Sequence, residues 1–385
     1  MRQLLVMLLV SGLLSACSGV PLLSGEDNAD PPAELEKLSG DIQLKQLWNR
    51  DVGVGFDEQF VRLVPTVHGE HLLVADRKGR VSALSADSGK PLWKVDTGVL
   101  ISAGPGAGGG LVLVASSDGE VLALGLDDGA QVWRTQVSSE VLAVPQIDLG
   151  VVVVQTADGK VVGLGARDGK QLWIYDRTVP VLTLRGTSTP AVERGVVIAG
   201  FASGKVAALS TERGFVAWET NVAIPQGRSE LERMVDIDSD PVIAGNSVYV
   251  TTFQGRLAVI DVQSGDPGWS RDMSSFAGLG VDFSQVYVTD DHSNVWALAR
   301  ASGASVWKQE KFRNRGLTGP EPYNDYVAVG DFEGYLHLLS RNDGHTVART
   351  RVDGKGIRAT PLAVGDVLYV YGNGGTLAAY SLSGR

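Results

Sequence analysis

The segment ALSADSGKPLW (83–93) recurs as ALGLDDGAQVW (123–133) and as GLGARDGKQLW (163–173). In each copy a glycine precedes a tryptophan by four residues, and the copies follow one another at a period of 40 residues. Looser copies continue along the chain as ALSTERGFVAW (208–218), VIDVQSGDPGW (259–269), ALARASGASVW (297–307) and LLSRNDGHTVA (338–348), where Ala348 replaces the tryptophan. A period of this size predicts a repeat fold.

Residues 141–177 show what one repeat contains. Four runs of β-forming residues, VLAVPQID, VVVVQTA, KVVGLGA and QLWIYD, are separated by short turns that carry Gly or Asp. Turns this short make neighbouring strands antiparallel hairpin partners. A four-stranded sheet of this kind cannot cover both of its own faces, but copies packed face to face in a ring can. The sequence therefore predicts an all-β protein with the architecture of a β-propeller.

The number of blades follows from a count of the strands. Eight segments have the pattern of a third strand, but only seven are followed by a fourth. The missing strand is at the N-terminus, in IQLKQLWNRDVG (42–53), where Leu47-Trp48 matches Leu92-Trp93. We expect an eight-bladed propeller of four-stranded antiparallel blades, closed by this N-terminal strand. Trp48 then takes the eighth of the equivalent positions and Trp296 is extra, and we expect the recurrent tryptophans to pack between blades rather than bind a ligand.

The N-terminus predicts export and lipidation. MRQLLVMLLVSGLLSAC has one basic residue and an apolar run too short to span a bilayer, which indicates a signal peptide over residues 1–16. Leu14-Ser15-Ala16-Cys17 resembles the bacterial lipobox, and Cys17 is the only cysteine, so we expect it to carry lipid. An ordinary secretory signal with an incidental cysteine is the alternative. Ser18, by the same resemblance, favours the outer membrane over inner-membrane retention.

The rest of the chain divides into a tether and the propeller. Residues 17–41 combine the lipidated cysteine with a stretch rich in Ser, Gly, Pro, Asp and Glu, which predicts a flexible tether with a short helical turn at AELEKL (33–38). The propeller is expected over residues 42–385.

Function should lie where the repeats differ from one another. From each tryptophan to the proline that opens the next blade, the ordinary links run 12 or 13 residues. Three links are longer: 17 residues from Trp48 to Pro65, 17 from Trp173 to Pro190, and 23 from Trp218 to Pro241. The last two lie on consecutive blades, so we expect them side by side on one face of the ring.

The contents of these two links favour a protein-docking surface. In DRTVPVLTLRGTSTP (176–190), an extended backbone would put Leu182 and Leu184 on one side with Arg185 beside them. In NVAIPQGRSELERMVDIDSDP (221–241), Ser229 and Glu232 have the spacing of a capping box ahead of a short helical turn, and Asp236 and Asp238 follow. Apolar anchors rimmed by charge are typical of protein interfaces. In the alternative, the leucines cap the end of the barrel and the aspartates satisfy strand ends.

The sequence gives little support for binding of nucleic acid, calcium or a dinucleotide. The net charge of −10 argues against nucleic acid as a partner. DIDSD (236–240) begins like a calcium loop, but Pro241 stands where such a loop needs glycine and Ser247 where it needs glutamate. GPGAGG (104–109) matches a dinucleotide-binding pattern but leads into a strand. We therefore expect no catalytic residue, no cofactor and no metal site.

Two resemblances bear on function. The unit A-x-D-x-x-x-G-x-x-x-W resembles the repeat of the pyrroloquinoline quinone (PQQ) dehydrogenases, which are eight-bladed propellers. Together with the lipobox and the long links VPVLTLRG (179–186) and MVDIDSDP (234–241), the whole chain resembles the BamB (YfgL) family, the lipoproteins of the outer-membrane β-barrel assembly (BAM) machinery. That resemblance implies a non-enzymatic scaffold on the periplasmic face of the Gram-negative outer membrane, which assists the folding and insertion of outer-membrane proteins.

The same resemblance implies a partner and a site. It assigns binding of the POTRA domains of BamA to the positions of Leu182, Leu184, Arg185, Asp236 and Asp238. Direct contact with unfolded outer-membrane proteins stays open, as does docking by strand addition to a blade edge. A propeller that binds another envelope partner and a PQQ-dependent oxidoreductase remain as alternative functions.

Overall fold

The computed structural model describes residues 30–38, 42–184 and 186–383, and these residues contain no α-helix. The chain divides into two units, residues 1–32 and 33–385, and all the strands lie in the second. The predicted signal peptide, Cys17 and Arg185 lie outside the described residues. No helix long and apolar enough to cross a membrane is found in the part of the chain that is described.

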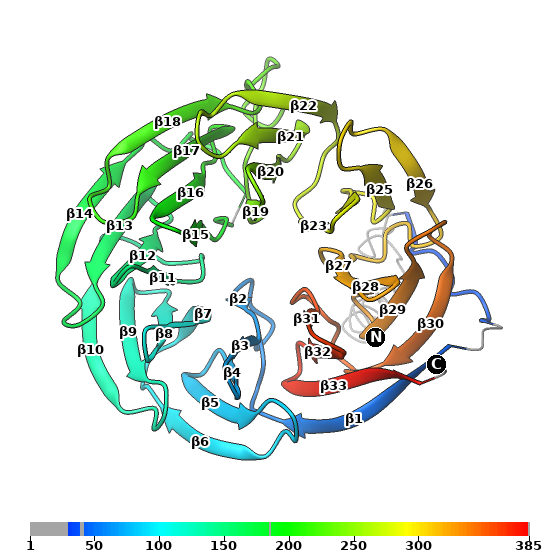
Figure 1. Ribbon diagram of the computed structural model, residues 1–385, viewed down its shortest axis with the longest axis horizontal. Helices are drawn as coiled ribbons and strands as arrows, with labels where there is room; N and C mark the ends of the chain where they lie inside the picture. The colour runs from blue at the N-terminus through cyan, green and yellow to red at the C-terminus, as the bar shows by residue number, and fades with distance from the viewer. Residues whose placement is uncertain (1–29, 39–41, 185, 384–385) are drawn as a thin grey trace, which may run out of the picture. The chain divides into compact units, whose positions relative to one another are not determined.

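The strands form eight sheets that follow one another round a ring, with the inner strand of each sheet nearest the centre (Figure 1). We number these sheets as blades 1 to 8. From the inner to the outer strand, blade 1 contains β3 (Thr66–His68), β4 (His71–Ala75), β5 (Arg80–Ser85) and β6 (Pro91–Asp96); blade 2 contains β7 (Ile101–Gly108), β8 (Leu111–Ser116), β9 (Glu120–Gly125) and β10 (Gln131–Gln136); blade 3 contains β11 (Gln146–Asp148), β12 (Val151–Gln155), β13 (Lys160–Gly165) and β14 (Gln171–Asp176); and blade 4 contains β15 (Ala191–Glu193), β16 (Val196–Gly200), β17 (Lys205–Ser210) and β18 (Val216–Asn221).

The second half of the ring is built in the same way. Blade 5 contains β19 (Val242–Ala244), β20 (Ser247–Thr251), β21 (Arg256–Asp261) and β22 (Pro267–Asp272); blade 6 contains β23 (Leu279–Val281), β24 (Gln285–Thr289), β25 (Val295–Ala299) and β26 (Ser305–Gln309); blade 7 contains β27 (Glu321–Tyr323), β28 (Tyr326–Gly330), β29 (Tyr335–Ser340) and β30 (Thr346–Arg351); and blade 8 contains β31 (Leu362–Val364), β32 (Val367–Tyr371), β33 (Thr376–Ser383) and β1 (Gln43–Asp51). The prediction of an eight-bladed propeller is confirmed.

The ring closes through the two ends of the chain. Strand β1 pairs antiparallel with β33, from Gln43 opposite Ser383 to Asp51 opposite Thr376. Figure 1 shows this blue strand as the outermost strand beside the red one. The closure predicted from the missing fourth strand is therefore confirmed.

The recurrent tryptophans join each blade to the next. All seven indole Nε1 atoms donate a hydrogen bond to a backbone carbonyl of the following blade, at 2.7–3.2 Å. Each ring also covers the glycine of that blade's turn, so closely that a Cβ added there would lie 2.5–2.6 Å from a ring atom. These pairs, written tryptophan first, are Trp48–Gly89, Trp93–Gly129, Trp133–Gly169, Trp173–Gly214, Trp218–Gly265, Trp269–Gly303 and Trp307–Gly344. The repeated Gly-x-x-x-Trp spacing is thus an inter-blade joint, and the packing role of the tryptophans is confirmed.

The junction between blades 7 and 8 is built differently. Ala348 is buried there in a hydrophobic cluster with Tyr380, and Leu44 of β1 packs against the same cluster. Tyr380, on β33 of blade 8, contributes an aromatic ring to this cluster. Trp296, the extra tryptophan, lies on the third strand of blade 6, outside the set of joints.

Substitution of the joint glycine is expected to destabilise the ring. Gly129→Ala adds a methyl group 2.6 Å from the Trp93 ring at a φ of +70°, whereas Gly98→Ala adds one at a φ of +72° with nothing within 4 Å. Gly98→Ala should cost about 1 kcal/mol through backbone strain alone. Overpacking should add about 1–3 kcal/mol at Gly129. Urea unfolding of both variants measures the difference, and equal midpoints would contradict the steric account of the joint.

Two local features differ from expectation. Strand β2 (Arg62–Leu63) pairs parallel to β7, so blade 2 has a fifth, innermost strand. The long link after β1 makes this possible because it has enough residues to cross to blade 2 before it enters β3. The helical turn predicted at 33–38 is wrong: these residues have no secondary structure, and Ala33 pairs instead with the backbone of Arg313.

Candidate functional site

The three long links lie at the same end of the blades. Link 1 (52–65) contains β2, link 2 (177–190) joins blade 3 to blade 4, and link 3 (222–241) joins blade 4 to blade 5. Each runs from an outer strand to the next inner strand, and in an antiparallel meander all such connections emerge at one end of the sheets. We call this end of the blades the link face.

Links 2 and 3 are in direct contact, as their positions on consecutive blades predicted. The backbone N–H of Leu184 donates to Oδ1 of Asp236 at 3.2 Å. The N–H of Thr189 donates to Oδ1 of Asp240 at 2.5 Å. The aspartates of link 3 therefore hold the backbone of link 2 in place. We refer to links 2 and 3 together as the docking links.

Link 2 presents apolar side chains to solvent. Val181 is 95% exposed and Leu182 is 41% exposed, while Leu184 is half-buried. The alternation predicted for an extended strand is incomplete, because residues 181–182 form a bend and link 2 contains no strand. The placement of Arg185 is not described, so its relation to the leucines stays a prediction.

Link 3 has the predicted capping-box contacts, but no helix. The N–H of Glu232 donates to Oγ of Ser229 at 3.3 Å, and the N–H of Ser229 donates to Oε2 of Glu232 at 3.1 Å. The chain makes only a hydrogen-bonded turn over 230–233 before it continues as coil. Leu231 at this turn is 62% exposed and Met234 is buried, so the turn is fixed to the ring on one side and open on the other.

The two aspartates of the predicted site occupy different environments. Asp236 is only 1% exposed, and its Oδ2 lies buried without a hydrogen-bond partner. Burial raises the pKa of Asp236 to about 6. Asp238 is half-buried, and burial together with the charge of Asp236 raises its pKa to about 7, although Arg62 acts in the opposite direction. The site therefore changes charge near neutral pH.

Arg62 is the residue of this site that sequence reasoning missed. Its Nη2 lies 2.7 Å from Oδ1 of Asp240, and its Nη1 donates to the backbone carbonyl of Asp238 at 3.2 Å. Strand β2 carries Arg62 to this position from link 1. The only signal in the sequence was the excess length of link 1, which equals that of link 2.

A small cavity lies between the docking links and blades 3 and 4. Its volume is about 40 Å³, and its lining includes Thr183, Gly186, Asp238, Gln155 and Phe201. Pockets that bind cofactors or drug-sized molecules measure roughly 300–1,000 Å³. This space suits one or a few water molecules rather than an organic cofactor.

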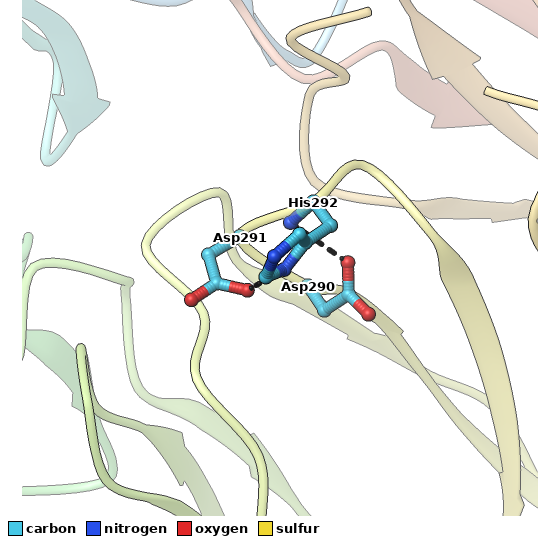
Figure 2. Close-up of side chains that lie close together, drawn as sticks. All are labelled: Asp290, Asp291 and His292. Atoms are coloured by element: carbon cyan, nitrogen blue, oxygen red, sulfur yellow. Dashed lines mark hydrogen bonds and ion pairs between the residues drawn. The ribbon is translucent and has the colours of Figure 1, made fainter. Parts of the chain in front are cut away.

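Local contacts engage two of the three aspartates of link 3. Asp236 accepts from Leu184, and Asp240 pairs with Thr189 and Arg62. Among the described residues, three metal-ligating side chains come together elsewhere, at Asp290, Asp291 and His292 in the turn between β24 and β25 (Figure 2).

That cluster is explained by its own hydrogen bonds. Asp290 accepts from the N–H of His292 at 3.0 Å, as Figure 2 shows, and from the indole Nε1 of Trp296 at 2.9 Å. It also accepts from the N–H and Nδ2 of Asn294. Asp291 contacts Nδ1 of His292 at 2.6 Å. Asp290 therefore holds the turn and the extra tryptophan in place.

Comparison with known proteins places the chain in a family. The family model described as "Outer membrane protein assembly factor BamB" matches residues 44–101 and 77–309. Proteins of that name are 49% identical in Pseudomonas aeruginosa, over 91% of this chain and 93% of theirs, and 50% identical in Marinobacter adhaerens, over 96% and 94%. The crystal structure of BamB from Moraxella catarrhalis superimposes with a TM-score of 0.80 at 26% identity, covering 88% of this chain and 100% of that one.

More distant structures share the fold alone. A quinohemoprotein alcohol dehydrogenase from Pseudomonas putida HK5 has a TM-score of 0.71 at 14% identity, over 89% of this chain and 76% of its own. Such a likeness carries no activity with it. The identities of about one half over nearly the full length, together with the family model, decide the assignment: the chain belongs to the family of the outer membrane protein assembly factor BamB.

Proposed function

We propose that this chain is a non-enzymatic scaffold subunit of the BAM machinery, and that its docking links bind the POTRA domains of BamA. The observation that carries the proposal is the contact between Leu184 and Asp236, which locks two adjacent long links into one surface. The apolar side chains of Val181, Leu182 and Leu231 are exposed on the docking links, which also carry aspartates with raised pKa values. Apolar anchors on a fixed backbone, with charge around them, suit a protein partner.

The residues of the site have different roles in this proposal. Leu182 and Leu184 contact the partner. Asp236 is buried, so it acts by holding the backbone of Leu184 rather than by touching the partner. Asp238 contributes charge at the edge of the surface. Arg185 adds a cation beside the leucines, as the family resemblance implies.

Docking by strand addition has less support than docking through the links. In every blade the pairing of the outermost strand with its neighbour shifts register at, or just before, the tryptophan or Ala348. Such β-bulges twist an edge strand and interrupt its row of free N–H and C=O groups. An added strand would find only the short segment after the bulge.

The decisive experiment is a titration of the mature protein with the isolated POTRA domains of BamA. Saturable binding that depends on the docking links supports the proposal. Binding of a different envelope protein through the same links, with none to the POTRA domains, would favour the alternative binding module. Uptake of PQQ with calcium would favour the oxidoreductase.

The affinity for the POTRA domains is expected to depend on pH. With a pKa of about 7, Asp238 is mostly protonated at pH 6 and mostly ionised at pH 8. If the partner binds the carboxylate form, the Kd at pH 6 should be about tenfold weaker than at pH 8. Isothermal titration at both values measures this, and Asp238→Asn should abolish the difference.

The direction in which protonation of Asp238 changes folding stability shows that weaker binding at low pH would not come from unfolding. The pKa of Asp238 is higher in the folded state than in the unfolded chain, so this group favours the folded state at low pH and costs stability as pH rises through 7. Protonation of Asp238 at pH 6 therefore does not unfold the site. A Kd that is equal at pH 6 and pH 8 would remove Asp238 from the interface.

We further propose that lipid on Cys17 holds the protein on the periplasmic face of the outer membrane. Cys17→Ser removes the only thiol that can carry diacylglycerol. Each buried CH₂ of an acyl chain contributes about 0.8 kcal/mol, so loss of the lipid should release most of the protein into the soluble periplasmic fraction. Sedimentation of the variant with the outer membrane at the wild-type level would show that another contact is the main anchor.

A further inference from the structure

The segment between the predicted lipid site and the propeller has a binding site of its own on the ring. Ala33 uses both of its backbone polar groups: its N–H donates to the carbonyl of Arg313 at 3.0 Å, and its carbonyl accepts from Nη1 of Arg315 at 2.9 Å. Arg313 and Arg315 belong to the link between β26 and β27, which we call link 6 (310–320). One backbone and one side-chain hydrogen bond therefore hold the segment on this link.

Two consecutive side chains of the segment contact the ring. Leu35 packs against the buried cluster that contains Phe312 and Leu317 of link 6. The carboxylate of Glu36 lies 2.8 Å from Nζ of Lys311, and its backbone carbonyl accepts from Nη2 of Arg349 at 2.9 Å. Glu34 and Lys37 are exposed. Residues 33–36 thus bind the ring by both apolar and polar contacts.

The ring side of this contact is rigidly built. Arg315 is buried, and its Nε and Nη2 donate to Oδ2 of Asp331 at 2.9 and 2.8 Å. Nη2 also contacts Glu333, and the same Asp331 oxygen lies 3.0 Å from Nε2 of the buried His337. These contacts fix the guanidinium so that Nη1 points at Ala33. A buried charge network of this kind holds its geometry because every member depends on the others.

We propose that residues 33–38 form a strap that fixes the point at which the lipid tether leaves the propeller. The exit is then at the junction of blades 6 and 7, two junctions along the ring from link 3, rather than at the start of β1 in blade 8. This inference rests on the proposed lipid at Cys17.

The strap also sets the reach of the tether. From Cys17 to Ala33 there are 33 − 17 = 16 residues, which extend to about 55 Å at most. Without the strap the tether would run to Gln43, 43 − 17 = 26 residues, or about 90 Å. The strap therefore limits both the distance and the orientation of the ring relative to the membrane, and leaves the docking links away from the exit.

Hydrogen exchange of the full mature chain tests whether the strap is docked. The amide of Ala33 should be protected, and Leu35→Asp should raise its exchange rate at least about tenfold while the exchange of the blades is unchanged. Glu34→Gln, which alters the neighbouring exposed side chain, should leave the rate as in the wild type. An unprotected Ala33 in the wild-type protein would overturn the proposal.

Energy transfer on vesicles tests the exit point. Because Cys17 is the only native cysteine, a single cysteine introduced at Glu310 in link 6 or at Glu212 in blade 4 can be labelled alone on the lipidated protein. Transfer to headgroup-labelled lipid should be higher from position 310 than from position 212, and Leu35→Asp should remove the difference. Equal transfer in the wild type would overturn the orienting role. Failure of the wild-type protein to bind vesicles would instead overturn the lipid anchor and the exit role with it, whereas the exchange result does not depend on the lipid.

Discussion

Leu184→Asp is expected to abolish most of the affinity for the POTRA domains while the ring stays folded. Leu184 is half-buried on link 2, with its N–H on the carboxylate of Asp236. The substitution removes an apolar anchor and adds a third carboxylate beside Asp236 and Asp238. Loss of a central apolar anchor costs at least about 2 kcal/mol, so the Kd should rise at least about 30-fold.

The matched control is a leucine-to-aspartate substitution at the end of a blade opposite the link face. Leu149 is 61% exposed in the turn between β11 and β12, which lies opposite the link face. Leu149→Asp should leave the Kd unchanged. Neither variant should shift the thermal midpoint by more than a few degrees, because neither side chain belongs to the buried clusters between the blades. Equal affinity of Leu184→Asp and wild type would place the interface elsewhere.

The fold could be predicted from the sequence because one local rule recurs around the whole ring. A glycine with positive φ, at the spot that the preceding blade's tryptophan covers, leaves little choice of residue. Because of that constraint the Gly-x-x-x-Trp pattern recurs about every 40 residues. Trp48 belongs to a fourth strand that has no other strands of its blade beside it in the sequence, and this predicted how the ring closes. Only the junction at Ala348, which packs in a cluster with Tyr380, departs from the rule.

The site was predictable only in part, because its contacts cross between segments that no period relates. Extra length marked the docking links, and their adjacency followed from blade order. Arg62 is separated from Asp238 and Asp240 by 176 residues or more in the sequence, and nothing in the local sequence of link 1 predicts this contact. The burial of Asp236 could not be predicted either, because an aspartate in a polar segment is expected to be exposed. Long-range placement of this kind comes from the geometry of the ring.

The second large effect is expected from Arg62→Asp. Arg62 pairs with Asp240, donates to the backbone of Asp238 and lowers the pKa of Asp238. Reversal of its charge places a third carboxylate beside those of Asp238 and Asp240. It also removes the contacts that join the end of link 3 to link 1. We expect the Kd for the POTRA domains at pH 7 to rise about tenfold or more, since like charges at short distance disfavour the ionised site.

A pH series distinguishes a positioning role for Arg62 from simple loss of structure. Without the arginine the pKa of Asp238 should rise, so the pH at which binding recovers should move above that of the wild type. Arg134→Asp, which breaks an ion pair with Glu120 on the outer part of blade 2, should leave both the Kd and its pH profile unchanged. A uniform loss of affinity at every pH would mean that Arg62 merely stabilises link 1. A shifted profile would mean that Arg62 sets the charge of Asp238, and that a contact between links far apart in the sequence controls the pH at which the site can bind.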